Sequence, residues 1–117
     1  MFNQTTLNTN LEHLTSKEEV KELINNNEKA VIVCGRMGPM CIPVYGIMDS
    51  LREKNQDIQF RDMLFDHPDS EIIRNLPECQ TFRGLPYTVY FKNGKVVKAT
   101  SSIKNAKQVK EIIKEVF

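Results

Sequence analysis

The chain has 117 residues, of which 40% are hydrophobic and 26% charged, and its 16 basic and 15 acidic residues leave a net charge of +1. This composition is typical of one folded domain and excludes disordered, collagen-like and coiled-coil proteins. The balanced charge argues against nucleic-acid binding, which needs a basic face. No apolar run approaches the ~20 residues of a membrane span, and the start of the chain lacks a secretory-signal pattern. We therefore expect a single cytoplasmic domain over residues 1–117, with neither a nucleic-acid nor a membrane partner.

The first third of the chain predicts a helix followed by a buried strand. Residues 1–12 are polar and are expected to form either a short edge strand, around residues 5–7, or a flexible arm. Ser16 starts the helix, because Glu19 completes a capping box three residues later and apolar residues follow at helical spacing. The continuous apolar run at 30–33 is typical of a strand that is buried on both faces.

The middle of the chain predicts a second helix, a strand and a short third helix. The second helix follows a loop at residues 35–39. The residues expected on its inward face are Val44, Ile47, Met48 and Leu51. The alternating residues 58–63 indicate a strand. Pro68 suits the first turn of a helix over residues 69–76, which Pro77 stops.

The end of the chain predicts an antiparallel hairpin and a last helix. Strands at 87–91 and 95–99 flank an Asn-Gly turn, and Asn105 caps the helix that follows. The residues of that helix expected to face the sheet are Val109, Ile112, Ile113 and Val116. The earlier strand-helix-strand unit requires a parallel strand pair. The sequence therefore predicts an α/β fold with a mixed central sheet of four or five strands and helices on both faces.

Two segments carry a resemblance to the thioredoxin family. Residues 83–95 read RGLPYTVYFKNGK, which is similar to the family's Gly-Ile-Pro-Thr segment with its cis-proline and to the Phe-Lys-Asn-Gly hairpin after it. Gly38 and Pro39 follow a buried strand and resemble the centre of the family's Trp-Cys-Gly-Pro-Cys site. The similarity runs from about residue 16 to residue 117 and implies the thioredoxin fold.

The chain departs from the family at the residues that carry its chemistry. The two family cysteines fall on Met37 and Met40, and the preceding tryptophan falls on Arg36. The family's buried aspartate falls on Val31, and the glycine after the last strand is replaced by Ser102 or a neighbour. Because a thioether cannot form a disulfide, the Met-Gly-Pro-Met segment cannot carry out the family's usual reaction.

Two cysteines near this segment offer a displaced redox pair. Cys41 falls in the first turn of the second helix, where unpaired N–H groups and partial positive charge favour a thiolate, and Arg36 is close enough in sequence to add to this. Cys34 lies where the buried strand ends. A disulfide needs Cα atoms within about 7 Å, a distance that the intervening loop permits but does not require. The alternative is that Cys34 is a small buried apolar residue and Cys41 an idle thiol.

Pro43 leaves two placements open for the start of the second helix. If the helix begins near Pro39, Pro43 lies inside it and removes a backbone hydrogen bond. If the helix begins at Pro43, the proline is tolerated and Cys41 becomes the cap. Both placements leave Cys41 at the positive end of the helix.

The resemblance also implies a substrate-binding surface. In the family, the cis-proline loop faces the helix start, and the residue before the proline offers its backbone to an extended peptide. On this basis the expected substrate-binding residues are Leu85, Pro86, Arg36, Gly38 and Pro39.

The remaining polar and thiol side chains are expected to have ordinary roles. Cys79 is interpreted as a free, half-buried cysteine rather than a regulatory thiol. His13 and His67 are far apart in sequence and are expected on the surface. Asp62 and Asp66 follow a strand and are expected to have turn or cap roles rather than acid–base roles.

The leading hypothesis is a thiol–disulfide oxidoreductase in which Cys41 attacks and Cys34 resolves the mixed disulfide. Its substrate would be a cysteine-containing protein or a small thiol, with a reductant of the thioredoxin-reductase type and neither a cofactor nor a bound metal. One alternative is a redox-inactive protein-binding module that keeps the docking groove. The other is a Cu(I)-binding protein that uses the soft ligands Cys34, Met37, Met40 and Cys41.

Overall fold

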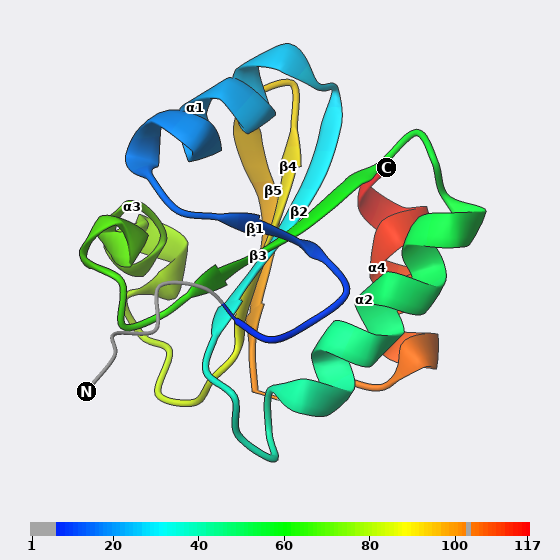
Figure 1. Ribbon diagram of the computed structural model, residues 1–117. Coiled ribbons are helices and arrows are strands. Elements are labelled where there is room, and N and C mark those ends of the chain that lie inside the picture. The colour runs from blue at the N-terminus through cyan, green and yellow to red at the C-terminus, as the bar shows by residue number, and fades with distance from the viewer. Residues whose placement is uncertain (1–6, 103) are drawn as a thin grey trace.

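A computed structural model describes residues 7–102 and 104–117 of the chain, which form a five-stranded mixed sheet with helices on both faces (Figure 1). The strands, in the sheet order β1-β3-β2-β4-β5, are β1 (Glu12–Leu14), β3 (Gln59–Leu64), β2 (Lys29–Gly35), β4 (Tyr87–Lys92) and β5 (Lys95–Ser101). The helices are α1 (Lys17–Asn26), α2 (Ile42–Lys54), α3 (Glu71–Arg74) and α4 (Ala106–Val116). Strands β1, β3 and β2 are parallel, whereas β4 and β5 are antiparallel to their neighbours. The predicted fold class is confirmed.

The sheet separates two apolar clusters. Helices α1 and α3 cover one face, and α2 and α4 cover the other (Figure 1). Side chains alternate along β2: Val31 and Val33 belong to the α2–α4 cluster, while Ile32 and Cys34 belong to the α1–α3 cluster. The face on which a β2 side chain lies therefore determines which of the two apolar clusters it belongs to.

The edge strand lies later in the chain than the sequence predicts. Residues 5 and 6 are outside the described residues, and Leu7 is buried in the α2–α4 cluster. The strand is β1, whose three residues pair in parallel with β3. A segment this short has no periodic pattern of its own, so only its pairing with β3 identifies it as a strand.

The helix caps agree with the sequence in most respects. Ser16 caps α1, because its Oγ accepts the Glu19 N–H at 3.1 Å. The Glu19 carboxylate, however, accepts hydrogen bonds from the N–H and hydroxyl of Thr15, both at 2.6 Å. Asn105 caps α4 and forms a complete capping box with Gln108.

Helix α2 begins at Ile42, with Cys41 as its N-cap and Pro43 in its first turn. The helix therefore begins one residue before Pro43, close to the placement that puts Cys41 at the cap. Pro43 is accommodated there because the first N–H groups of a helix have no intrahelical partner.

The third helix is shorter than predicted. Within residues 68–79 there are a 3-10 turn (Pro68–Ser70), the single turn of α3 and a second 3-10 turn (Pro77–Cys79) that begins after the predicted end of the helix. Leu76 is extended, with φ −60° and ψ 138°, because the residue before a proline is disfavoured in the helical region. No helix among the described residues is long and apolar enough to cross a membrane.

Candidate functional site

The site that the sequence indicated lies at the end of β2, where the chain turns into α2. The N–H groups of Cys41 and Ile42 both donate to the carbonyl of Gly38, at 3.1 and 3.0 Å. This tight turn places the Cys41 side chain under the loop, where it is only 3% exposed. Its Sγ accepts a hydrogen bond from the Arg36 backbone N–H at 3.5 Å. The Cys41 thiol is therefore held at the start of α2 but shielded from solvent.

Gly35, Tyr45 and Pro86 are packed closely around the Cys41 thiol. A Cβ atom added to Gly35 would lie 2.6 Å from the Tyr45 hydroxyl, 2.9 Å from Cys41 Sγ and 3.1 Å from Pro86 Cβ. The Tyr45 hydroxyl donates to the Arg36 carbonyl at 2.9 Å, and burial raises the pKa of that hydroxyl. Glycine is required at position 35 because any side chain there would displace the thiol, the hydroxyl or the proline ring.

The loop before β4 lies against the same thiol. The Leu85–Pro86 peptide bond is cis, and the Pro86 carbonyl accepts the Ser102 N–H at 3.1 Å. Ser102 has φ +65°, a conformation that favours glycine. Among the turn and loop hydrogen bonds between described backbone groups, none engages Leu85. The backbone of Leu85 is thus free of such bonds beside Cys41 and Pro86.

Cys34 does not share this site. Its side chain belongs to the α1–α3 cluster, whereas that of Cys41 belongs to the α2–α4 cluster, so the two thiols lie on opposite faces of the sheet. Cys34 pairs with Met63 on β3 and with Tyr87 on β4. Burial raises the pKa of its thiol to about 12. All three cysteines of the chain are free and buried.

Cys79 is free, as expected, but fully buried rather than half-buried. It lies in the second 3-10 turn and shares the α1–α3 cluster with Cys34. Burial raises the pKa of its thiol to about 11. Its environment is that of a packed apolar residue.

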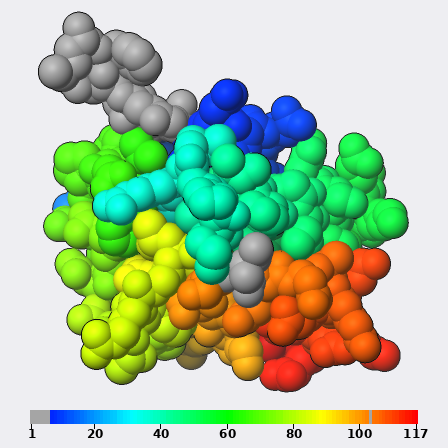
Figure 2. All heavy atoms as spheres, turned by 90° about the horizontal axis from the view of Figure 1, so that it is seen from below, coloured from blue at the N-terminus to red at the C-terminus, as the bar shows by residue number. Residues whose placement is uncertain are grey.

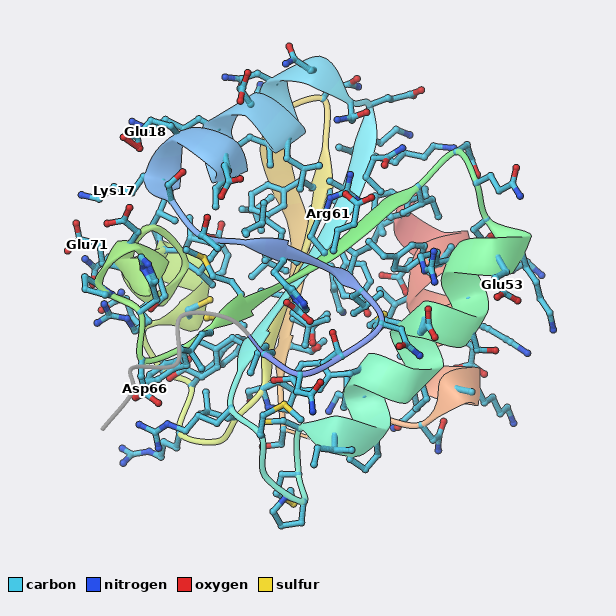
Figure 3. The ribbon with its side chains drawn as sticks, viewed as in Figure 1. Lys17, Glu18, Glu53, Arg61, Asp66 and Glu71 are labelled. Atoms are coloured by element: carbon cyan, nitrogen blue, oxygen red, sulfur yellow. The ribbon has the colours of Figure 1, made fainter. Side chains whose placement is uncertain are left out.

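The Arg36 side chain extends away from Cys41. Its guanidinium binds Asp66 through two hydrogen bonds of 2.8 Å and lies 5.2 Å from the centre of the Phe65 ring. Asp66 lies beside the lower end of the sheet in Figure 3. The hydrogen bonds from Arg36 hold the pKa of Asp66 below its usual range. Arg36 therefore contributes its backbone to the thiol site, while its charge is paired elsewhere.

An apolar patch covers the outside of the turn. Met37 is 37% exposed, and Met40 and Ile42 are each 48% exposed. We call these three residues the apolar patch. The segment that contains them, residues 37–42, lies near the centre of the face in Figure 2, between the N-terminal segment in blue and the loop near residue 85 in yellow. Among the described residues, the other exposed large apolar side chain is Val97, on β5.

A cavity of about 230 Å³ opens beside the apolar patch. Met37 and the α2 residues Ile42, Tyr45 and Asp49 line it together with residues 8–10 of the N-terminal segment. The N-terminal segment therefore forms one wall of a hollow that adjoins the site. The sequence did not predict this wall.

The sequence also missed a buried polar group under α2. Asp62 is fully buried on β3 and accepts a hydrogen bond from the Thr9 hydroxyl, and its Oδ1 lies 2.6 Å from Nδ1 of His13. The expected turn or cap role of Asp62 and the expected surface role of His13 are corrected, whereas Asp66 remains exposed in an ion pair. His67 caps a 3-10 turn by accepting the Asp69 N–H at 3.0 Å.

The four soft ligands considered for Cu(I) differ in exposure and in the apolar cluster to which they belong. Met37 and Met40 are exposed, Cys41 lies beneath them, and Cys34 lies on the opposite face of the sheet. Over residues 7–102 and 104–117, no group of three or more His, Cys, Asp or Glu side chains could hold a metal ion.

Known proteins resemble this chain in structure but do not match it in sequence. No family model and no curated protein matches the sequence. The structure is similar to that of mitochondrial thioredoxin 3 from Saccharomyces cerevisiae, with 25% identity, a TM-score of 0.73, and coverage of 90% of this chain and 94% of that one. The oxidised thioredoxin of Plasmodium falciparum has 18% identity and a TM-score of 0.73, covering 90% and 96% of the two chains. A thioredoxin mutant from Halobacterium salinarum has 14% identity and a TM-score of 0.75, covering 97% and 96%.

The sheet order, the Leu85–Pro86 loop against the start of α2 and these structural neighbours agree with one another. By its structure, the chain has the thioredoxin fold.

Proposed function

We propose that this chain is a protein-binding module that holds an extended segment of a partner protein between the apolar patch and the Leu85–Pro86 loop. One observation carries the proposal. Of the four large apolar side chains that are exposed among the described residues, three gather at positions 37, 40 and 42, while every thiol of the chain is buried. The surface that a partner meets here is apolar and has no accessible sulfhydryl group.

Two kinds of contact would hold the segment. Apolar side chains of the partner would cover Met37, Met40 and Ile42, since exposed apolar surface gathered in one place is typical of an interaction site. The backbone of the partner would pair with that of Leu85, in the manner of an added strand. The partner is thus an extended peptide segment with apolar side chains, and no cofactor is needed.

Thiol–disulfide exchange is the second candidate, and the position of Cys41 favours it. Cys41 Sγ accepts the Arg36 N–H, and both Cys41 Sγ and Pro86 Cβ lie close to the position of a Cβ atom on Gly35. A Cys41 thiolate would attack a partner disulfide, the partner's S–S bond would break, and a mixed disulfide and a partner thiolate would result. Cys34 would then attack Cys41 Sγ, forming the Cys34–Cys41 disulfide and releasing the second partner thiolate. A reductant of the thioredoxin-reductase type would restore both thiols.

The attack of Cys34 on Cys41 Sγ requires a movement of the Cys34 side chain. The Cys34 side chain would have to leave the α1–α3 cluster before its sulfur met Cys41 Sγ, which belongs to the α2–α4 cluster. The burial that raises the pKa of Cys34 to about 12 also opposes its thiolate. The binding module requires no such movement, so the geometry supports it better.

The binding module is tested by titrating ¹⁵N-labelled protein with two extended decapeptides, one with a central pair of leucines and one with glycines in their place. The leucine peptide is expected to shift amide signals of the non-proline residues within 37–42 and 84–87 and to bind more tightly. Met40→Gln is expected to weaken binding by about tenfold, which corresponds to the loss of one apolar contact. Val97→Gln is the matched control, because Val97 is also exposed but lies outside the apolar patch. Equal effects of the two variants, or shifts away from the patch, would contradict the proposal.

The variant Cys41→Ser separates the two candidates. It removes the attacking sulfur and keeps a small hydrogen-bonding side chain beside Gly35 and Tyr45. The binding module predicts that the leucine peptide still binds this variant. The exchange candidate predicts that wild type, and not the variant, reduces a peptide disulfide when dithiothreitol is supplied.

A further inference from the structure

The methionines of this chain fall into two environments. Met37 and Met40 are 37% and 48% exposed, whereas Met48 and Met63 are fully buried in the two apolar clusters. Met1 lies outside the described residues. The exposed pair therefore presents its thioether sulfurs where a small molecule can reach them, and the chain carries two buried methionines for comparison.

The local backbone keeps the exposed pair on the outside. The turn is closed by two hydrogen bonds to the Gly38 carbonyl, from the N–H groups of Cys41 and Ile42. A Cβ atom on Gly38 would meet nothing within 4 Å, so the middle of the turn stands clear of the rest of the described protein. The cavity beside Met37 adds open space on the side of the N-terminal segment.

The thiols of this chain are expected to react with an oxidant more slowly than the exposed thioethers do. Cys34, Cys41 and Cys79 are all buried. Burial also raises the pKa of Cys34 to about 12 and that of Cys79 to about 11, so few thiolates form there at neutral pH. Thioether oxidation needs no deprotonation, and exposure is then the main condition for it. The oxidisable sulfur that meets solvent at this site is a thioether.

We propose that Met37 and Met40 are a modification site for hydroperoxides, and that their oxidation to sulfoxides converts the apolar patch into a polar surface that no longer holds its partner. The thioether sulfur attacks one peroxide oxygen, so that an S–O bond forms and the O–O bond breaks. Sulfur loses two electrons, and the other peroxide oxygen takes up a proton and leaves as water or, from an organic hydroperoxide, as an alcohol. The loss of the partner rests on the proposed binding function, whereas the oxidation itself does not.

A sulfoxide changes binding because it adds a strongly polar S–O group. Covering this group with an apolar partner side chain removes it from water without supplying a hydrogen bond. Each sulfoxide in the apolar patch is expected to weaken binding of the leucine peptide by about tenfold. The oxidation is thus a way of regulating this site with sulfur chemistry that needs no cysteine.

The oxidation is tested on the whole chain with hydrogen peroxide, followed over time by peptide mapping. Met37 and Met40 are expected to be oxidised at least roughly tenfold faster than Met48 and Met63. They are also expected to react before any of the three cysteines. Equal rates for exposed and buried methionines, or prior oxidation of a cysteine, would overturn the proposal.

Two further readouts separate the modification from the proposed function. Oxidised protein is expected to elute earlier from a hydrophobic-interaction column, and peroxide should cause no such shift in Met37→Leu/Met40→Leu. An equal shift in that double variant would overturn the proposal. Oxidation should also weaken binding of the leucine peptide, and unchanged binding would overturn the regulatory part. If the unoxidised protein binds no peptide at all, the proposed function and the regulatory part fail together, while selective oxidation still supports the modification site.

Discussion

The Nδ1 atom of His13 lies 2.6 Å from Oδ1 of Asp62, although the two residues are 49 positions apart in the chain. They are opposite each other in the parallel pair of β1 and β3. The Thr9 hydroxyl donates to the other carboxylate oxygen. The buried carboxylate of Asp62 thus ties the N-terminal segment, which lines the cavity beside the apolar patch, to the sheet.

This contact predicts a pH dependence of folding stability. Burial raises the pKa of Asp62, and the hydrogen bonds from Thr9 and His13 offset only part of that effect. The carboxyl group of Asp62 therefore binds its proton more tightly in the folded protein than in the unfolded chain. The resulting stabilisation is complete below the unfolded pKa, near pH 4, and is lost as pH rises through the raised pKa.

The comparison is between wild type and Asp62→Asn, whose amide does not titrate. The free energy of unfolding of wild type minus that of the variant is expected to fall between about pH 4 and neutral pH. Urea unfolding at a series of pH values measures it. A difference that grows with pH would mean that attraction to charged His13 outweighs burial, and would contradict this account of Asp62.

The close approach at Gly35 predicts that Gly35→Ala destabilises the fold by about 1–3 kcal/mol, because the new methyl group overlaps Tyr45, Cys41 and Pro86. Gly46→Ala is the matched control. Gly46 lies within α2 and a Cβ there would meet nothing within 4 Å. That variant should gain about 0.5–1 kcal/mol from helix propensity. Equal stability of the two variants in urea would show that the space at Gly35 is open.

The exposed ion pair of Arg36 and Asp66 predicts a large effect on titration and a small one on stability. In Arg36→Gln, the pKa of Asp66 should rise toward its ordinary value, because the two guanidinium hydrogen bonds that lower it are lost. Both side chains are more than half exposed, so unfolding free energy should change by at most about 1 kcal/mol. Carboxyl ¹³C titration and urea unfolding measure the two effects. An unchanged pKa would mean that Arg36 does not hold Asp66 in solution.

Local patterns predicted the fold well because each helix and each longer strand has its own signal. The Asn-Gly turn is an example: Asn93 and Gly94 both have positive φ, 54° and 82°, as the hairpin requires. The strand β1 and the His13–Asp62 contact depend instead on pairing between distant segments. No local pattern carries that information.

The sequence contained part of the information that places Cys34 and Cys41 on opposite faces of the sheet. Alternation along a strand puts Cys34 on the face of Ile32 and Gly35 on the face of Val33. What the sequence did not supply is the face that α2 covers, which is set by the right-handed crossover and the order of strands in the sheet. The exposure of Met37 and Met40 likewise follows from the closed turn at Gly38 and not from residue type.

The central claim is that this thioredoxin fold presents an apolar binding surface and has no working cysteine pair. Its most direct test is intact-mass thiol trapping of the purified protein, equilibrated in glutathione buffers from reducing to oxidising and followed by peptide mapping. The account predicts that Cys34 and Cys41 remain separate thiols across the series, because they lie on opposite faces of the sheet. A cooperative two-electron transition that links Cys34 to Cys41 would contradict it and would establish the thiol–disulfide candidate instead.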